Sequence, residues 1–324
     1  MLAYLIRRLF FFVPIVFGVM LLTFVLFFVV QSPEATARRV LGQKATPKSV
    51  ENWLHNRGYD KPLLINTTPG QPWHDSLFVT QLGRLVTFDL GTSDVSGRPL
   101  REIFAQGALP SLLLTVPAFL VSLAVSVALA LYLVFIRNAA VDFMATFLCV
   151  ALMSVPVMVY VIFGQFVVAQ VLNYFPAFGF EASGWSAPKF LLLPVALMVV
   201  SGLGADVRLF RALFLEEMGQ DYIRTARAKG VSKARVLLSH VFKNGLINLI
   251  TLVVASLPFL IMGSLLLENF FGIPGLGNVL VTAIQAPDFA VVQASVFLGS
   301  LMYLGGLLLT DLCYAWADPR IRLG

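Results

Sequence analysis

The sequence predicts an all-α polytopic membrane protein with six transmembrane helices, because its composition and its hydropathy pattern both suit a lipid environment. Hydrophobic residues make up 58% of the 324-residue chain and charged residues only 12%, whereas a soluble domain carries about 25% charged residues. Six apolar stretches are long enough to cross a bilayer, which takes about 20 residues of helix. These stretches are Leu9–Val30, Ala108–Ile136, Phe143–Leu172, Phe190–Val207, Leu246–Leu267 and Val291–Trp316.

The first apolar stretch follows two basic residues, Arg7 and Arg8, in the manner of a signal peptide. The run from Leu9 to Val30 is too long for the apolar region of a cleaved signal, and it lacks a convincing small-residue cleavage site. We therefore expect residues 1–30 to hold the N-terminus and a permanent first transmembrane helix.

Residues 31–107 form the only sizeable segment between predicted spans, and their six prolines argue against long helices across most of it. One short helix is expected over Pro47–Leu54, with Thr46 as its cap and Pro47 at its first position. Ahead of the second span, the run Asp89-Leu90-Gly91-Thr92-Ser93 is expected to form a surface turn.

Lysine and arginine residues indicate the orientation. With the N-terminus inside, thirteen basic residues fall on the cytoplasmic side, and the two short outer connections contain only Lys189. The positive-inside rule therefore places both termini in the cytoplasm and residues 31–107 outside, since a segment of that length crosses regardless of its charge. The net charge of +6 reflects this one-sided distribution and does not indicate a nucleic-acid partner.

The stretch that begins at Gln220 is basic and rich in helix formers, and Gly230 interrupts it once. Gln220 or Asp221 can cap a first helix, and Gly230 suits the left-handed position that closes it. Ser232 can then cap a second helix that begins at once. A pair of short helices is therefore predicted in the cytoplasmic loop 208–245, between the fourth and fifth spans.

Two interpretations of this basic stretch compete. A charged run between membrane helices is most often a solvated loop, but a loop has no need of two capped helices. Small residues at Thr225, Ala226 and Ala228 would let the backbone of a partner protein come close, and the nearby arginines can pair with acidic groups. We therefore favour a docking element. Its candidate residues are Tyr222, Arg224, Thr225, Ala226, Arg227, Ala228, Lys229 and Gly230.

A turn-rich run between the fifth and sixth spans is predicted to lie at the outer mouth. Pro274 and Gly275 suit positions i+1 and i+2 of a type II turn, and residues Val279–Ala286 can form a short helix after it. The candidate residues of this mouth motif are Phe271, Pro274, Gly275 and Gly277.

The chain lacks the sequence signals of catalysis. It contains no Gly-Lys dipeptide, so it has no phosphate-binding loop of the Gly-x-x-x-x-Gly-Lys-Ser/Thr type and is not expected to hydrolyse ATP itself. Its three histidines lie outside the predicted spans and its two cysteines lack metal-ligand spacing, so no catalytic, cofactor or metal site is expected. Ion-coupled carriers use titratable groups in mid-membrane, whereas the acidic residues here lie at or near predicted span ends. These residues are Asp142, Asp206, Glu268 and Asp311.

The run Arg224-Thr225-Ala226-Arg227-Ala228-Lys229-Gly230 resembles the cytoplasmic loop motif of the membrane subunits of bacterial ABC importers, specifically the dipeptide, oligopeptide and nickel permease family. Asp89–Ser93, the mouth motif and the C-terminal run Asp318-Pro319-Arg320-Ile321-Arg322 resemble that family too, in the same order. One departure is Asn248, which stands where the loop motif of the family has a proline. The resemblance covers nearly the whole chain.

The resemblance implies a permease subunit that forms half of a translocation pathway for peptides or related solutes. It implies a second homologous permease, two ATP-binding cassette ATPase subunits and a periplasmic or lipid-anchored solute-binding protein as partners, in a bacterial inner membrane. The chain would then divide into residues 1–30, a periplasmic segment over residues 31–107, and a five-helix permease core over residues 108–324. The solute stays open among dipeptides, oligopeptides, modified peptides and nickel. The alternatives are a secondary transporter or channel working alone, or a scaffold protein without transport activity.

Overall fold

The computed structural model describes residues 2–42, 44–64, 66, 72, 74–136, 138–181 and 187–317. Across these residues the chain is built from helices, and the β-structure is limited to an isolated antiparallel bridge between Thr92 and Pro99. The expectation of an all-α fold is therefore confirmed. The C-terminal run Asp318-Pro319-Arg320-Ile321-Arg322 lies outside the described residues.

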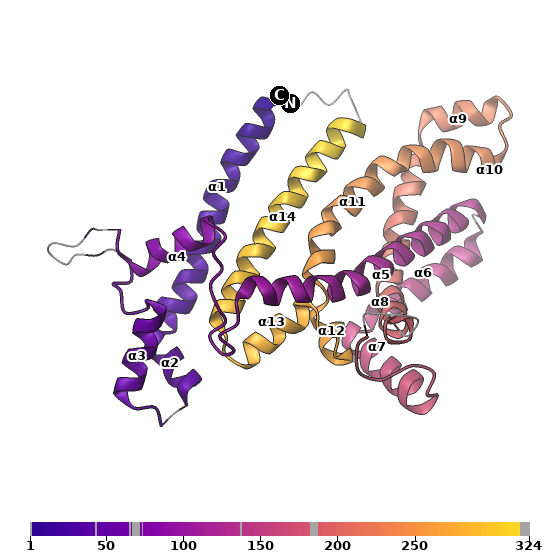
Figure 1. Cartoon of the computed structure of the whole chain (residues 1–324). Helices are drawn as coiled ribbons and strands as arrows, with labels where there is room; N and C mark the ends of the chain where they lie inside the picture. The colour runs from indigo at the N-terminus through magenta and orange to yellow at the C-terminus, as the bar shows by residue number, and fades with distance from the viewer. Residues whose placement is uncertain are drawn as a thin grey trace. The chain divides into compact units, whose positions relative to one another are not determined.

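Five helical segments in the described part of the chain are long and apolar enough to cross a membrane, and together they contain five of the six predicted spans (Figure 1). The first joins α1 (Leu2–Phe24) to its π-helical continuation η1 (Val25–Val30). The others are α5 (Leu100–Ile136), α8 (Ala187–Met218), α11 (Lys243–Met262) with the short helix α12 (Leu265–Phe271), and α14 (Phe289–Ala317).

The third predicted span is broken, which corrects the expectation of one helix over Phe143–Leu172. The helix α6 (Ala139–Ser154) and the helix α7 (Val157–Gly164), which continues as the π-helical η2 (Gln165–Val171), are bent by 84° relative to each other. The break lies at Val155 and Pro156. Val155 has extended backbone angles, as expected for a residue before proline, and Pro156 has no N–H to donate to a helix.

Among its described residues, the segment 31–107 contains three short helices ahead of the start of α5. The expected helix is present as α3 (Pro47–Arg57), with the Thr46 side chain accepting a hydrogen bond from the Ser49 N–H at 3.3 Å. Two further helices were not predicted. One is α2 (Pro33–Leu41), which Ser32 caps; Pro33 is compatible with its start, because a proline at the first helical position needs no N–H partner. The other is α4 (Leu77–Val86), which Ser76 caps.

Residue contacts divide the chain into two compact units, one built from residues within 1–107 and 279–305 and the other from residues within 108–278 and 306–323. In the first unit, Phe24 stacks on Phe28 with ring centroids 5.0 Å apart and meets the edge of Phe78, so α4 packs on the first span. The described residues of the second unit form two apolar clusters. One of them supports the predicted docking element.

Candidate functional sites

The predicted docking helix is present as α9 (Asp221–Ala228), which follows α8 after Gly219 and Gln220. Its C-terminal end is a Schellman motif, in which the Gly230 N–H donates to the Arg227 carbonyl at 2.9 Å and the Val231 N–H donates to the Ala226 carbonyl at 3.2 Å. Gly230 has a φ of +78°, so the left-handed conformation predicted from the sequence is confirmed.

The second helix of the pair is not separate, which corrects the expectation of two short helices. It begins as α10 (Lys233–Val236) and continues through the π-helical η3 (Leu237–Phe242) directly into α11 (Figure 1). Ser232 and Gln220 occupy the N-cap positions of α10 and α9, but neither side chain makes a capping hydrogen bond. The docking helix is therefore joined by short turns to two long helices, α8 and α10–α11.

The inner face of α9 is part of the apolar core of the second unit. Ile223 is fully buried and Ala226 is only 8% exposed, and both pack in a cluster with Phe214 of α8 and Val241 of η3. Ala226 therefore offers little surface to a partner protein, because its methyl group already faces the core. Ile223 and Ala226 are three residues apart and share one helix face, so the sequence contained the signal for this burial.

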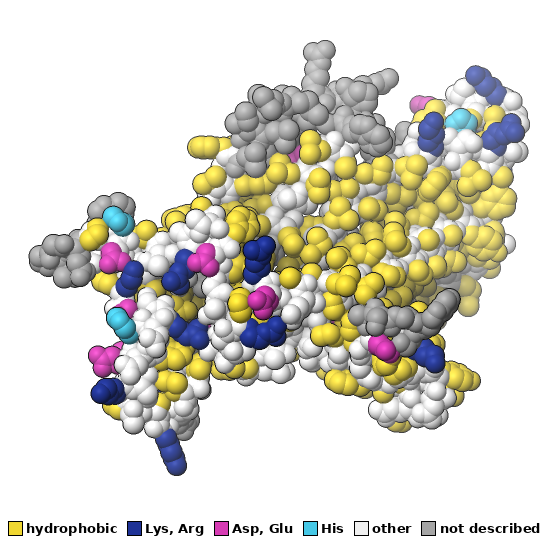
Figure 2. Space-filling view, viewed as in Figure 1, with side chains coloured by type: hydrophobic (Ala, Val, Ile, Leu, Met, Phe, Trp, Pro, Cys, Tyr) yellow, Lys and Arg dark blue, Asp and Glu magenta, His cyan; other side chains and the backbone are white. Residues whose placement is uncertain are grey.

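The outer face of α9 is exposed and basic. Figure 2 shows Lys and Arg side chains gathered at this end of the second unit, over α9 and α10. Arg224 pairs with Asp221 at 3.3 Å, but both side chains are more than three-quarters exposed, at 77% and 94%, so water screens the pair. The exposed members of the predicted set are Tyr222, Arg224, Thr225, Arg227, Ala228, Lys229 and Gly230.

Tyr222 is linked to the helix before it. Its hydroxyl donates a hydrogen bond to the Glu217 carboxylate near the end of α8. Burial and this carboxylate both raise the pKa of Tyr222, so the hydroxyl stays protonated and remains a donor. The contact joins the first turn of α9 to the last turn of α8 and limits rotation of α9 about its linker.

The mouth motif surrounds a buried carboxylate that the sequence analysis placed only at a span end. Glu268 of α12 is 0% exposed. It accepts hydrogen bonds from the Ser111 hydroxyl at 2.8 Å, the Ser264 N–H at 3.0 Å and the Asn278 N–H at 3.0 Å. One side chain thereby joins α5, the start of α12 and the start of α13 (Leu276–Gln285).

The glycines of this motif make room for that carboxylate. A Cβ atom at Gly275 would collide with the Glu268 carboxylate, and one at Gly277 would lie 2.9 Å from Glu268 Oε2 and 2.8 Å from the Leu265 nitrogen. Gly275 does not have a positive φ, so the expected type II turn is wrong. The Gly275 N–H instead donates to the Ile273 carbonyl at 2.8 Å, closing a tighter three-residue turn around Pro274. Steric crowding by the Glu268 carboxylate therefore explains why position 275 holds a glycine.

Phe271 anchors the same motif from the other side. Its ring is 1% exposed and packs with Leu114 of α5, Val161 of α7 and Leu193 of α8 in the second apolar cluster. Gly272 closes α12 with a φ of +66°. The mouth motif is therefore an internal structural element of the second unit, with buried apolar and polar anchors.

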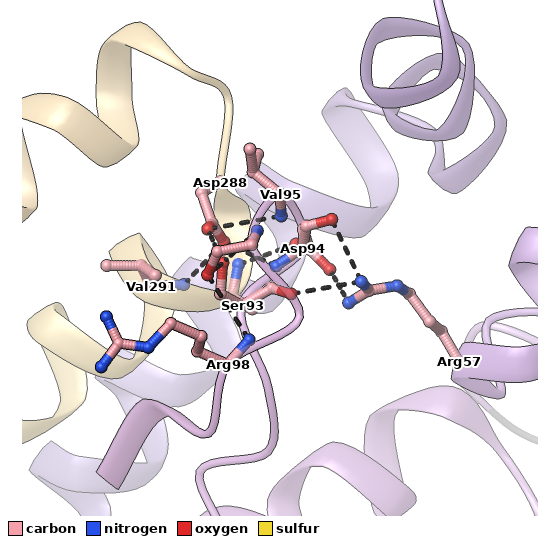
Figure 3. Close-up of polar contacts among 9 residues, drawn as sticks. Arg57, Ser93, Asp94, Val95, Arg98, Asp288 and Val291 are labelled. Carbon is pink, nitrogen blue, oxygen red and sulfur yellow. Dashed lines mark hydrogen bonds and ion pairs between the residues drawn. The ribbon is translucent and has the colours of Figure 1, made fainter. Parts of the chain in front are cut away.

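The expected turn at Asp89–Ser93 is present, with the Asp89 carboxylate accepting from the Gly91 N–H at 3.2 Å. The turn has a role that the sequence did not reveal, which Figure 3 shows. The Ser93 hydroxyl and the Asp94 N–H donate to Asp288, and Asp288 also accepts from the Val291 N–H at 3.4 Å as the cap of α14. The turn therefore holds the start of the last span.

Asp94 completes this network in the first unit. Its carboxylate pairs with Arg57 at 2.5 Å and accepts from the Ala290 N–H at 2.9 Å (Figure 3). Burial raises the pKa of Asp94, and the Arg57 guanidinium opposes that shift. Asp94 and Asp288 are 3% and 5% exposed. One guanidinium, that of Arg57, accompanies these two buried carboxylates, so the hydroxyl and backbone N–H donors around them are needed to compensate the remaining charge, because an unpaired buried charge is costly.

These helices and turns define a polytopic membrane protein, in which α9 is an exposed, basic element of the second unit. Comparison with known proteins specifies the class. Residues 121–323 match the family model of the binding-protein-dependent transport system inner membrane component, and residues 1–81 match the N-terminal model of such membrane components.

Two relatives align over nearly their whole lengths. The glutathione transport system permease protein GsiC of Pectobacterium atrosepticum is 34% identical over 322 residues, covering 99% of each chain. The dipeptide transport system permease protein DppB of Alkalihalophilus pseudofirmus is 27% identical over 345 residues, covering 99% of this chain and 100% of the relative. The chain belongs to the family of binding-protein-dependent transport system inner membrane components. It is thus a multi-pass inner-membrane permease subunit of an ABC importer.

Proposed function

We propose that this permease forms one half of a translocation pathway for peptides or related solutes, and that α9 docks onto an ATPase subunit. The names of the relatives, a glutathione and a dipeptide permease, support a peptide-type solute. The observation that carries the docking role is the division of α9 into two faces. Its inner face is anchored in the core by Ile223 and Ala226, and its outer face is exposed and basic.

The two-faced helix suits mechanical coupling. ATP can drive transport only if it changes the relative free energies of two conformations of the permease, through contacts that differ between them. The apolar cluster under α9 includes residues of α5, α8 and α11, such as Val134, Phe210 and Leu249. A force on the outer face of α9 would therefore reach three spans through packed side chains.

Two further contacts stiffen this end of the second unit. Arg211 of α8 pairs with Asp142 of α6 at 2.9 Å, and the Lys233 ammonium lies 4.9 Å from the centre of the Phe135 ring at the end of α5. Both contacts link neighbouring helices close to α9. A stiff end would transmit displacement of the docking helix instead of absorbing it.

The proposed assembly contains a second homologous permease, two ATPase subunits and a periplasmic or lipid-anchored binding protein that selects the solute. Both termini lie in the cytoplasm and residues 31–107 lie in the periplasm, in agreement with the distribution of Lys and Arg. ATP hydrolysis belongs to the partner subunits, because the chain lacks a phosphate-binding loop.

The direct test is purification of the tagged permease in mild detergent, followed by reconstitution into proteoliposomes. We expect ATPase subunits and a second permease to co-purify, and uptake of a radiolabelled dipeptide to require both ATP and the binding protein. Uptake by the permease alone, driven by an ion gradient without ATP, would support a stand-alone transporter and contradict the proposal.

A further inference from the structure

Asp206 is an acidic side chain on the wall of a cavity between three spans of the second unit. It lies on α8, five residues before Arg211. At 1.5 Å per residue, Arg211 is roughly 7–8 Å further along the helix. The predicted fourth span ends at Val207, next to Asp206. The helix in fact continues to Met218, and the partner of Asp206 is Ser122, well inside α5.

The cavity has a volume of about 140 Å³. Its wall combines apolar side chains with three polar ones, and α5, α8 and α11 all contribute. The lining includes Phe119, Ser122, Asp206, Leu209, Leu252 and Ser256.

The polar groups of this cavity offer hydrogen-bond acceptors. The Ser122 hydroxyl donates a hydrogen bond to Asp206 Oδ2 at 3.0 Å, and the Ser256 hydroxyl donates a hydrogen bond to the Leu252 carbonyl at 2.8 Å. Both hydroxyl oxygens therefore keep lone pairs that can accept. Among the described residues, no Lys, Arg or His forms an ion pair with Asp206.

A carboxylate in a membrane-spanning helix is costly against lipid, and such groups face water or a partner that compensates the charge. The face of α5, α8 and α11 that carries Asp206 is therefore a candidate for the wall of the solute pathway. Liquid water occupies about 30 Å³ per molecule, so the cavity has room for a small head group and not for the body of a peptide.

We propose that Asp206, Ser122 and Ser256 form a cation subsite in the solute pathway, which takes the ammonium group of a transported peptide. The carboxylate supplies the charge, and the two hydroxyl oxygens supply acceptors for the remaining N–H bonds of an ammonium. This inference rests on the proposed function as a peptide permease. It adds a residue-level binding site to that function.

The first experiment measures the electrostatic field in the cavity without using a peptide. A cysteine replaces Ser256 in an assembled transporter whose native Cys149 and Cys313 are changed to alanine. The reaction rates of a trimethylammonium and a sulfonate methanethiosulfonate reagent are then compared. We expect the cationic reagent to react faster, and the rate ratio to fall on the order of tenfold in Asp206→Asn but to persist in Asp206→Glu.

Gln170 lines a separate cavity and provides the matched control. The rate ratio at Gln170→Cys should not change when Asp206 is replaced by Asn. The inference would be overturned if the rate ratio at Ser256→Cys stays the same when Asp206 is replaced by Asn. It would also be overturned if the cysteine at position 256 reacts with neither reagent. Either result would mean that the cavity is not a water-filled, negatively charged site.

The second experiment measures uptake in proteoliposomes, with saturating binding protein loaded with either a dipeptide or its N-acetylated analogue. We expect Asp206→Asn to lower uptake of the free-amine dipeptide by about tenfold, and to leave uptake of the acetylated peptide as it is in the wild type. Equal loss for both peptides would overturn the inference, since Asp206 would then serve assembly. If the wild-type transporter moves neither peptide, the proposed function fails, and the labelling experiment still decides whether Asp206 attracts cations.

Discussion

The docking helix and the mouth motif both depend on glycine, but for opposite physical reasons. At Gly230 a Cβ atom would meet nothing within 4 Å, and the backbone has a φ of +78°, so the requirement is conformational. At Gly275 the φ is ordinary, and a Cβ atom would collide with the buried Glu268 carboxylate, so the requirement is space. One motif presents an exposed surface and the other holds a buried polar junction.

This difference predicts which region tolerates change. An exposed helix loses little stability when a charge is removed, because water replaces the lost partner. A buried junction loses stability when one member is removed, because the remaining donors stay buried without acceptors.

The largest contrast is all-or-none and concerns the side of the membrane on which the docking helix lies, compared with the segment 31–107. In a cysteine-free background, a cysteine at Ser49 of α3 should react with a membrane-impermeant thiol reagent applied outside intact spheroplasts. A cysteine at Gln220, beside α9, should react only after the membrane is opened. Labelling of Gln220→Cys from outside would reverse the orientation and remove the proposed docking role.

The next effect is on folding at the mouth motif. Glu268→Ala leaves the Ser111 hydroxyl and the Ser264 and Asn278 N–H groups without their acceptor, at a cost of about 1–3 kcal/mol for each buried group. We expect the variant to be scarce in membranes and to aggregate at lower temperature in detergent. Glu268→Gln, which keeps one acceptor oxygen and the shape, should be less affected. Wild-type abundance of Glu268→Ala would show that the junction does not support the fold.

The third effect separates coupling from stability at Gly230. Gly230→Val places a β-branched side chain in the left-handed region, at a cost of about 1–2 kcal/mol, and should change the angle between α9 and α10. We expect near-normal abundance, a steep fall in ATP-driven uptake and easier loss of ATPase subunits in detergent.

Gly58 provides the matched control for Gly230. It also closes a helix in the left-handed region, with a φ of +67° and no atom within 4 Å of a Cβ position, but it lies in the segment 31–107. Gly58→Val should carry similar strain and leave the ATPase subunits attached. If both valine variants behave alike, or if Gly230→Val transports at the wild-type rate, α9 is not the coupling element.

The smallest effect is expected at Arg227. Its guanidinium lies on the exposed face of α9, where it donates a hydrogen bond to the Met218 sulfur at 3.5 Å. Arg227→Ala should leave abundance unchanged and reduce uptake by less than Gly230→Val, because shape governs a docking contact more than one solvated charge does. A larger loss in Arg227→Ala than in Gly230→Val would indicate a charge-based interface.

Local sequence signals predicted the local features well. The cap at Thr46, the left-handed Gly230 and the turn at Asp89 follow from the conformational preferences of single residues, and each is confirmed. The break at Pro156 has such a signal too, in the proline itself, but the continuous apolar run around it predicts one span. The apolar residue Ile223, three residues before Ala226, likewise marked the inner face of α9.

The helical class, five of the spans and the family motifs follow from the sequence, because hydropathy and residue conformation are properties of short segments. The surroundings of Glu268, Asp206 and Asp288 exist only in the folded chain. Ser111 is 157 residues from Glu268, Ser122 is 84 residues from Asp206, and Ser93 is 195 residues from Asp288. The role of a buried carboxylate depends on which donors surround it, and folding brings those donors from distant parts of the chain.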